Sequence, residues 1–393
     1  MSLTKGLRLA WILMLISSLS YLHSINYIVR AFSILFSGVV VLYTISRNNI
    51  HVLKKDYFVI SFILYLIVCT LSIVVSVDAF ASVFKLTELA IDFLLVYIAY
   101  VFERKENDRF TPSYCIKSWI YFSIIVLLII WIGYFTAPSL FSTRSRGLIS
   151  KQLGANMLIS CNAIGSVAAA VIIYMLCSKE IRHKTFFIVL MSASVIFSMS
   201  RTSLFIVFIA VGLYFVLSKF RFRNLFLFVI AGFLLFYYYD TIIAFVMRGQ
   251  SQQDFSSMSG RTLMWTKVLE VVKESPLLGF GYGSGSNLIE LDNTAMTSVH
   301  NGFFEVLIDT GYLGVSFLIL YTLCSFSALI KRIKIYRMSN CIMPILLHVY
   351  IITRTFLSLG LGGWHTLDMM LFFAMTFDDL SAITKGRTCY ERK

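Results

Sequence analysis

The residue types best suited to chemistry in this chain are one histidine and a few arginines, which lie between or beside its long apolar runs. His300 stands in His-Asn-Gly directly before an apolar run, Arg201 in a Ser-Arg-Thr break, and Arg261 in a Gly-Arg pair. An imidazole exchanges a proton near neutral pH, which suits a general base. A guanidinium stays charged and binds phosphate through two parallel hydrogen bonds. Together these residues indicate proton transfer next to a bound anion.

Spacing alone leaves other interpretations open for each of them. A single histidine at a helix start is more often a cap or a packing residue than a catalyst, and Arg261 is as often an ordinary surface arginine. His23, His300 and His365, the histidines predicted on the outer side, do not pair at the i, i+4 spacing typical of a zinc site. The seven cysteines show no metal-binding spacing, so we expect small buried hydrophobic residues there.

The elements that position these residues are predicted to be membrane helices. The chain has 393 residues, of which 58% are hydrophobic and 14% charged, whereas a soluble domain carries about 25% charged residues. The net charge of +14 does not indicate nucleic-acid binding, because the basic residues form short clusters between apolar runs, as cytoplasmic loops of membrane proteins do. We therefore predict an all-α polytopic membrane protein with one integral membrane domain over 1–393.

About twelve apolar runs approach the ~20 residues that a spanning helix needs. They cover 7–22, 28–45, 57–76, 82–102, 117–136, 155–177, 184–199, 202–218, 224–243, 303–329, 341–359 and 364–381. With a cytoplasmic N-terminus, most Lys and Arg residues fall on the inner side, as the positive-inside rule favours. No small-residue cleavage site follows the first run, so it is predicted to span the membrane rather than to be a signal peptide. Both termini are then cytoplasmic.

The long outer loop, 244–302, is predicted to contain one amphipathic helix over Arg261–Glu274. Ser259 is a plausible N-cap and Pro276 a stop signal. A first turn with Arg261 and the free N–H groups of a helix N-terminus favours an anion. The following LLGFGYGSG is predicted to be a flexible turn, and it lacks the Lys-Ser/Thr of a nucleotide-binding loop. The apolar face of the helix consists of Met264, Val268, Val271 and Val272.

Several short motifs occur in a fixed order around these residues. They are Ser200-Arg201-Thr202, Gly260-Arg261 with Trp265, ESPLLGFGYG, His300-Asn301-Gly302-Phe303-Phe304-Glu305 and Asp309-Thr310-Gly311-Tyr312-Leu313-Gly314. Their order, their spacing and the large outer loop closely resemble the O-antigen ligase and Wzy-type polymerase superfamily. The similarity is clearest over about 140–320, and the expected twelve-span topology extends it to the whole chain.

The resemblance implies a metal-independent glycosyltransferase with a GT-C-like fold and no cofactor. Its site would face the periplasm from the bacterial inner membrane. The implied donor is a glycan on undecaprenyl pyrophosphate. The acceptor is a lipid-linked repeat unit in a polymerase and the lipid A-core in a ligase. Membrane lipids are expected partners, and a chain-length regulator is considered as a further one.

The resemblance also assigns roles to particular residues. His300 matches the essential histidine of the family, and Arg201 and Arg261 match its essential arginines. Further substrate-binding candidates are Arg144 or Arg146 in the outer linker 137–154, together with the auxiliary charges of Lys85 and Asp368. Glu305 or Asp368 is a candidate to orient the imidazole of the catalytic histidine, while Asp309 is expected to shape the turn.

Other functions are weighed against this one. A lipid-linked glycan flippase also fits twelve spans, but many transporters divide into similar halves, and the halves of this chain differ. A membrane scaffold is a further alternative, but it would not need the arginines clustered on the predicted outer side. Within the superfamily, the compact loop and the SRTS and HNGFFE motifs favour a polymerase slightly over a ligase.

Overall fold

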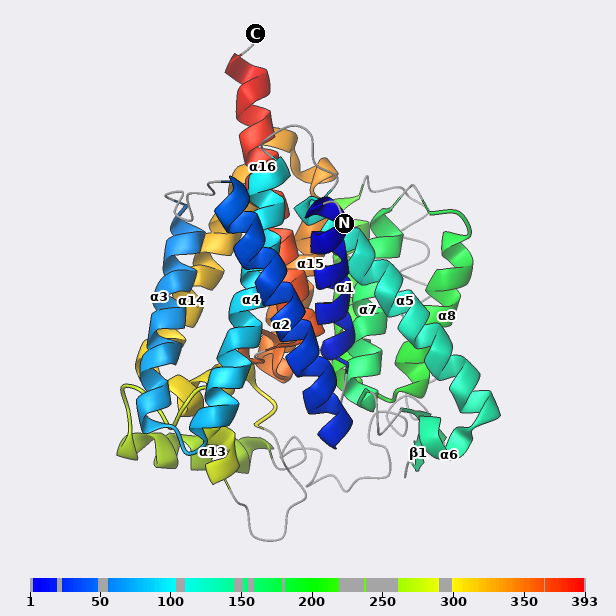
Figure 1. Ribbon diagram of the computed structural model, residues 1–393. Helices are drawn as coiled ribbons and strands as arrows, with labels where there is room; N and C mark the ends of the chain where they lie inside the picture. Colours follow the sequence, from blue (N-terminus) through cyan, green and yellow to red (C-terminus); the bar gives the residue numbers. More distant parts are fainter. Residues whose placement is uncertain are drawn as a thin grey trace. The chain divides into compact units, whose positions relative to one another are not determined.

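The computed structural model of the chain describes residues 3–19, 23–48, 56–103, 110–144, 151–154, 159–178, 181–218, 237, 261–289, 299–363 and 365–391. Within these ranges the chain is almost entirely helical (Figure 1). Each predicted apolar run overlaps a helix, except 224–243, which lies outside the described ranges apart from residue 237. The prediction of a helical polytopic membrane protein is confirmed at this level.

The long helices follow the apolar runs. They are α1 (Leu3–Ser17), α2 (His23–Asn48), α3 (Tyr57–Ser72), α4 (Ala79–Glu103), α5 (Pro112–Thr136), α7 (Cys161–Cys177), α8 (Lys184–Phe197), α9 (Arg201–Leu217), α14 (Gly302–Tyr336), α15 (Ile342–Leu357) and α16 (Leu367–Glu391). Shorter ones are α6 (Pro138–Phe141), α13 (Arg261–Val271) and the 3₁₀ turns η1 (Ile73–Val75), η2 (Val272–Glu274), η3 (Gly285–Leu288), η4 (Met338–Asn340) and η5 (Gly360–Gly362).

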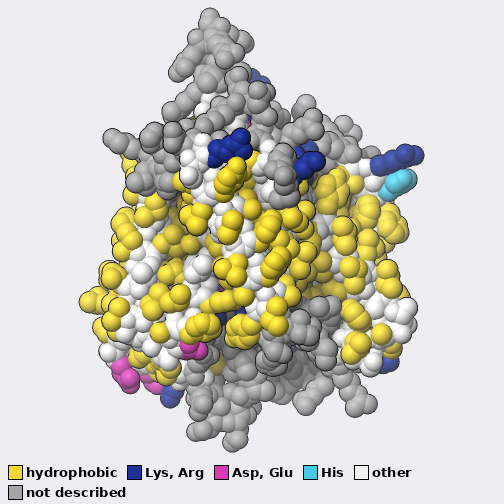
Figure 2. All heavy atoms as spheres, viewed as in Figure 1, with side chains coloured by type: hydrophobic (Ala, Val, Ile, Leu, Met, Phe, Trp, Pro, Cys, Tyr) yellow, Lys and Arg dark blue, Asp and Glu magenta, His cyan; other side chains and the backbone are white. Residues whose placement is uncertain are grey.

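Length and composition make four of the described helices candidate membrane spans. Segments Tyr27–Arg47, Tyr57–Val75, Pro112–Thr136 and Gly302–Tyr336 are long and apolar enough to cross a bilayer. On the face shown in Figure 2, hydrophobic side chains cover the middle, and most of the visible charged side chains lie toward the upper and lower edges. The total number of spans and the side of the membrane on which each loop lies stay predictions.

The linker 137–154, which is predicted to lie on the outer side, differs from the all-α expectation. After α6 it forms strand β1 (Ser142–Arg144), which pairs antiparallel with β2 (Lys151–Leu153). The N–H of Gly154 donates to the carbonyl of Phe141 and extends the pairing. The two strands satisfy each other's backbone groups, which an irregular loop would have to leave to water. The linker was predicted without regular structure, and this short hairpin adds a small β element to the otherwise helical fold.

The described chain divides into two compact units. Unit 1 comprises 1–121, 263–337 and 351–393, and α3, α4, α14 and α16 form its centre. Aromatic rings from these helices interlock there: the rings of Phe62 and Phe93 stack at 4.3 Å between centroids, and Phe373 meets Phe62 edge-on at 4.9 Å. Such pairs add to the burial of large apolar area. This unit carries the His300 turn.

Unit 2 comprises 122–262 and 338–350 and contains the predicted Ser-Arg-Thr break. Helix α7 packs against α8 and α9. Ser200 is the N-cap of α9, and its side chain accepts a hydrogen bond from the N–H of Ser203 at 3.4 Å. The prediction of one membrane domain over 1–393 stays a prediction.

Candidate functional site

The turn that carries His300 has a special backbone shape. His300 adopts a positive φ of 53°, which is uncommon for a residue with a Cβ and which Asn, Asp and His tolerate better than most. The next residue, Asn301, is the N-cap of α14, and its side-chain oxygen accepts from the N–H groups of Phe303 and Phe304 at 3.0 and 3.2 Å. A cap of this kind satisfies the free donors of a helix start. Capping thus belongs to Asn301 rather than to His300.

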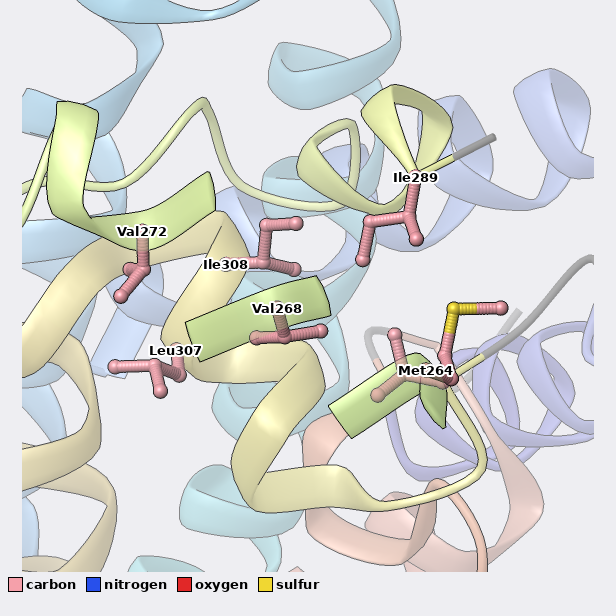
Figure 3. Close-up of a cluster of buried hydrophobic side chains, with 7 residues drawn as sticks. Met264, Val268, Val272, Ile289, Leu307 and Ile308 are labelled. Atoms are coloured by element: carbon pink, nitrogen blue, oxygen red, sulfur yellow. The ribbon is translucent and has the colours of Figure 1, made fainter. Parts of the chain in front are cut away.

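The helix α13 packs beside this turn. Met264, Val268 and Val272 form its buried face, and Figure 3 shows them against Leu307 and Ile308 of α14. The amphipathic helix predicted over Arg261–Glu274 is therefore confirmed as α13 followed by η2. In Figure 1, α13 lies crosswise below the lower ends of α3 and α4. The proposed N-cap Ser259 lies outside the described residues.

Trp265 of α13 contacts the residues on both sides of the His300 turn. Its indole N–H donates to the carbonyl of Val299 at 3.0 Å. Its ring stacks on that of Phe304, with 5.5 Å between centroids and 12° between planes. A helix that begins at Arg261 is thereby attached to the residue that precedes His300.

The glycine-rich segment after α13 is an ordered turn, contrary to the expectation of flexibility. The N–H of Phe280 donates to the carbonyl of Ile308 at 2.9 Å, and the N–H of Gly281 donates to that of Asp309 at 2.9 Å. The N–H of Tyr312 donates back to the carbonyl of Pro276 at 2.8 Å. These bonds become possible because α14 is kinked at Gly311, which has φ 64° and ψ −166°. Sequence-distant backbone bonds fix the turn.

Asp309 shapes this turn, as expected from the sequence. Its carboxylate oxygens accept from the N–H groups of Gly283 at 2.7 Å and Gly285 at 2.9 Å. The ammonium of Lys85 donates to the carbonyl of Gly283. Burial raises the pKa of the neighbouring Tyr282 well above its usual value, so this phenol stays protonated at neutral pH. Lys85 has a contact inside the protein, and its role toward substrate stays a prediction.

The two carboxylates considered for orienting the imidazole have other contacts. Glu305 is buried beside the hydroxyl of Ser286 and the backbone of Val299, and its Oε2 has no hydrogen-bond partner among the described residues. Asp368 accepts from Arg354, with Nη2 at 3.0 Å and Nε at 3.1 Å from the same oxygen. The orienting role of either residue stays a prediction.

The candidate arginines lie at the starts and ends of elements. Arg201 and Arg261 are the first residues of α9 and α13, and both side chains are half-buried. Arg144 ends β1, and Arg146 lies outside the described residues. A helix start offers free N–H groups to an anion. The binding roles of these arginines stay predictions.

Sequence reasoning missed a set of buried charges in unit 1. Arg30 donates to both carboxylate oxygens of Glu88, with 2.7 Å from Nε to Oε1. His365 lies between Asp92 and Ser17, with hydrogen bonds of 2.6 and 2.8 Å. The available signal was the presence of acidic residues within the apolar run 82–102, since charges inside spans are costly and normally paired.

No cluster of His, Cys, Asp and Glu that could hold a metal occurs in the described ranges.

The fold and the site define a polytopic membrane protein with a histidine turn held at the start of α14 by contacts to α13 and to Phe356. Residues 186–319 match the family model described as O-antigen ligase. The chain is also 30% identical over 89 residues to the exopolysaccharide production protein ExoQ of Rhizobium meliloti (strain 1021), a match that covers 20% of each chain. The resemblance indicated by the motifs is thus confirmed, and the matched stretch contains Arg201, Arg261 and His300.

Proposed function

We propose that this protein is an inner-membrane glycosyltransferase that joins oligosaccharide repeat units carried on undecaprenyl pyrophosphate. The observation that carries the proposal is the O-antigen ligase match over 186–319, because it includes the candidate base and two candidate arginines. The hydrogen bond from Trp265 of α13 to the carbonyl of Val299 supports the proposal that α13 and the His300 turn belong to one site. The name of the relative, an exopolysaccharide production protein, favours a reaction that builds a chain.

The arginines are proposed to bind the donor pyrophosphate at the periplasmic face. Arg201 and Arg261 would hold it, assisted by Arg144 or Arg146. Negative charge grows on the pyrophosphate as the sugar–phosphate bond breaks. Fixed guanidinium groups in a water-poor site stabilise that charge in the transition state. This arrangement uses neither a metal nor a cofactor.

His300 is proposed as the general base. It takes the proton of an acceptor hydroxyl while that oxygen attacks the anomeric carbon. The bond between this carbon and the phosphate oxygen breaks, and undecaprenyl pyrophosphate leaves with the electron pair. Attack from the opposite face inverts the anomeric centre. Positioning of the base turn is important because small displacements are costly in such reactions.

A ligase that transfers the glycan to the lipid A-core is the second candidate. The description of the matched family as O-antigen ligase favours it. A flippase is less well supported, since neither comparison points to transport.

The surface glycan of a deletion strain separates these functions. A gel should resolve lipid A-core, core with one repeat, and the full ladder. Core capped with a single repeat supports the polymerase. Bare core, with long glycan still on undecaprenyl pyrophosphate, supports the ligase instead. Single repeats held on the inner leaflet contradict both and indicate a flippase.

A further inference from the structure

The His300 turn lies on a second segment of unit 1, Phe356–Gly363. The side-chain amide of Asn301 donates to the carbonyl of Phe356 at 3.0 Å. A Cβ added to Gly302 would overlap the carbonyl oxygen of Leu359 and lie 2.9 Å from the nitrogen of Gly362. The two backbones are therefore in direct contact. The position of the His300 turn therefore depends on the position of this segment.

Polar contacts hold the segment from within and just beyond its end. The N–H of Leu361 donates to the hydroxyl of Thr355, the residue before Phe356, at 3.1 Å. His365 follows two residues after Gly363; its Nδ1 lies 2.6 Å from Asp92 Oδ2 on α4, and its Nε2 lies 2.8 Å from Ser17 Oγ on α1. Exposed fractions of 5%, 0% and 2% for His365, Asp92 and Ser17 show that this chain is buried.

Asp92 depends on His365 for its hydrogen bonding. Its second oxygen, Oδ1, has no hydrogen-bond partner in the part of the chain that the structure describes. A buried carboxylate is strongly unfavourable without a partner, so its one short bond holds the imidazole in a fixed orientation. The hydroxyl of Ser17 fixes the opposite edge of the ring. Together they attach the segment to α1 and α4.

We infer that His365 is a positioning residue for the His300 turn, held in place by the buried chain Ser17–His365–Asp92. The inference rests on the proposed function, in which His300 is the base. His365 touches no reacting atom in this role. It fixes the segment on which Asn301 and Gly302 lie, and so it fixes the direction in which His300 faces the acceptor.

The test uses purified full-length enzyme in lipid, assayed with lipid-linked repeat units. His365→Ala and Asp92→Ala should each lower kcat about tenfold or more, as expected for a misplaced base, while the KM for the donor changes less than about threefold. Hydrogen–deuterium exchange should become faster in 299–305 and 356–363. The variant His365→Ala leaves the buried carboxylate of Asp92 without its partner. The double variant Asp92→Ala/His365→Ala removes that carboxylate as well. It should recover the yield of folded protein but not kcat.

Asp379→Ala is the matched control. Asp379 is also fully buried, and it pairs with Arg332 at 2.7 Å in the middle of α16. It should lower folded yield without changing kcat per folded enzyme. The inference is overturned if the double variant regains wild-type kcat, or if exchange in 299–305 stays unchanged. His300→Gln in the same assay separates the two hypotheses: wild-type turnover by this variant contradicts the proposed mechanism, whereas the exchange measurement still tests the positioning.

Discussion

The indole N–H of Trp265 lies 3.0 Å from the backbone carbonyl of Val299, the residue that precedes His300. Val299 is buried, so this carbonyl has little access to water. The same indole ring stacks on Phe304, four residues past His300. One side chain of α13 thus contacts both sides of the candidate base.

Trp265→Phe should keep the stacking and lose the hydrogen bond. A buried carbonyl without a donor costs about 1–3 kcal/mol, so we expect lower thermal stability in detergent and lower kcat. Trp11→Phe is the matched control, because it loses an indole hydrogen bond to Ser118 of α5. Equal kcat losses in the two variants would contradict a special role for Trp265.

Gly311→Ala should damage the turn that docks on the kink of α14. Gly311 has φ 64° and ψ −166°, a region that essentially only glycine adopts, and the strain costs on the order of 1–3 kcal/mol. A Cβ there would also lie 2.6 Å from the carbonyl oxygen of Pro276. We expect a clear drop in the thermal midpoint of purified protein.

Gly212→Ala provides the control for this variant. Gly212 lies inside α9, and a Cβ added there meets nothing within 4 Å. Alanine is the better helix former by about 1 kcal/mol. The thermal midpoint should stay the same or rise. If Gly311→Ala behaves in the same way, the kink does not need glycine.

Local patterns predicted the elements of this protein well. In the described ranges hydropathy located the long apolar helices, and helical spacing located the buried face of α13. These features depend on residues close together in sequence, where period and composition carry the information.

Sequence-distant contacts could not be predicted in this way. The local sequence of the glycine-rich segment predicts flexibility. The segment is ordered because it forms hydrogen bonds to Ile308 and Asp309 of α14, which its own sequence does not reveal. The partners Asp92 and His365 are separated by 273 positions. The sequence showed only that their charges lie in or near apolar runs, which indicates that they need partners without naming them.

Arg201→Lys tests the proposed arginine clamp. Lysine keeps the charge but loses the planar pair of donors that binds phosphate. We expect kcat/KM to fall about tenfold with lysine and roughly a hundredfold or more with alanine, the size of a lost transition-state contact. Arg182→Lys, in the exposed turn before α8, should have no effect. Full activity of both Arg201 variants would rule out the clamp.

His300→Gln tests the base directly. Loss of a general base typically lowers kcat about 10²–10⁴-fold. A histidine accepts a proton only in its neutral form, so wild-type turnover should fall on acidification as the imidazole becomes charged, and rise again at higher pH. The residual turnover of the glutamine variant should lack this acid limb, because glutamine does not titrate. His183→Gln, at an exposed position before α8, serves as the control and should keep the wild-type profile. An unchanged acid limb in His300→Gln would assign it to another group, and His300 would then serve only to shape its turn.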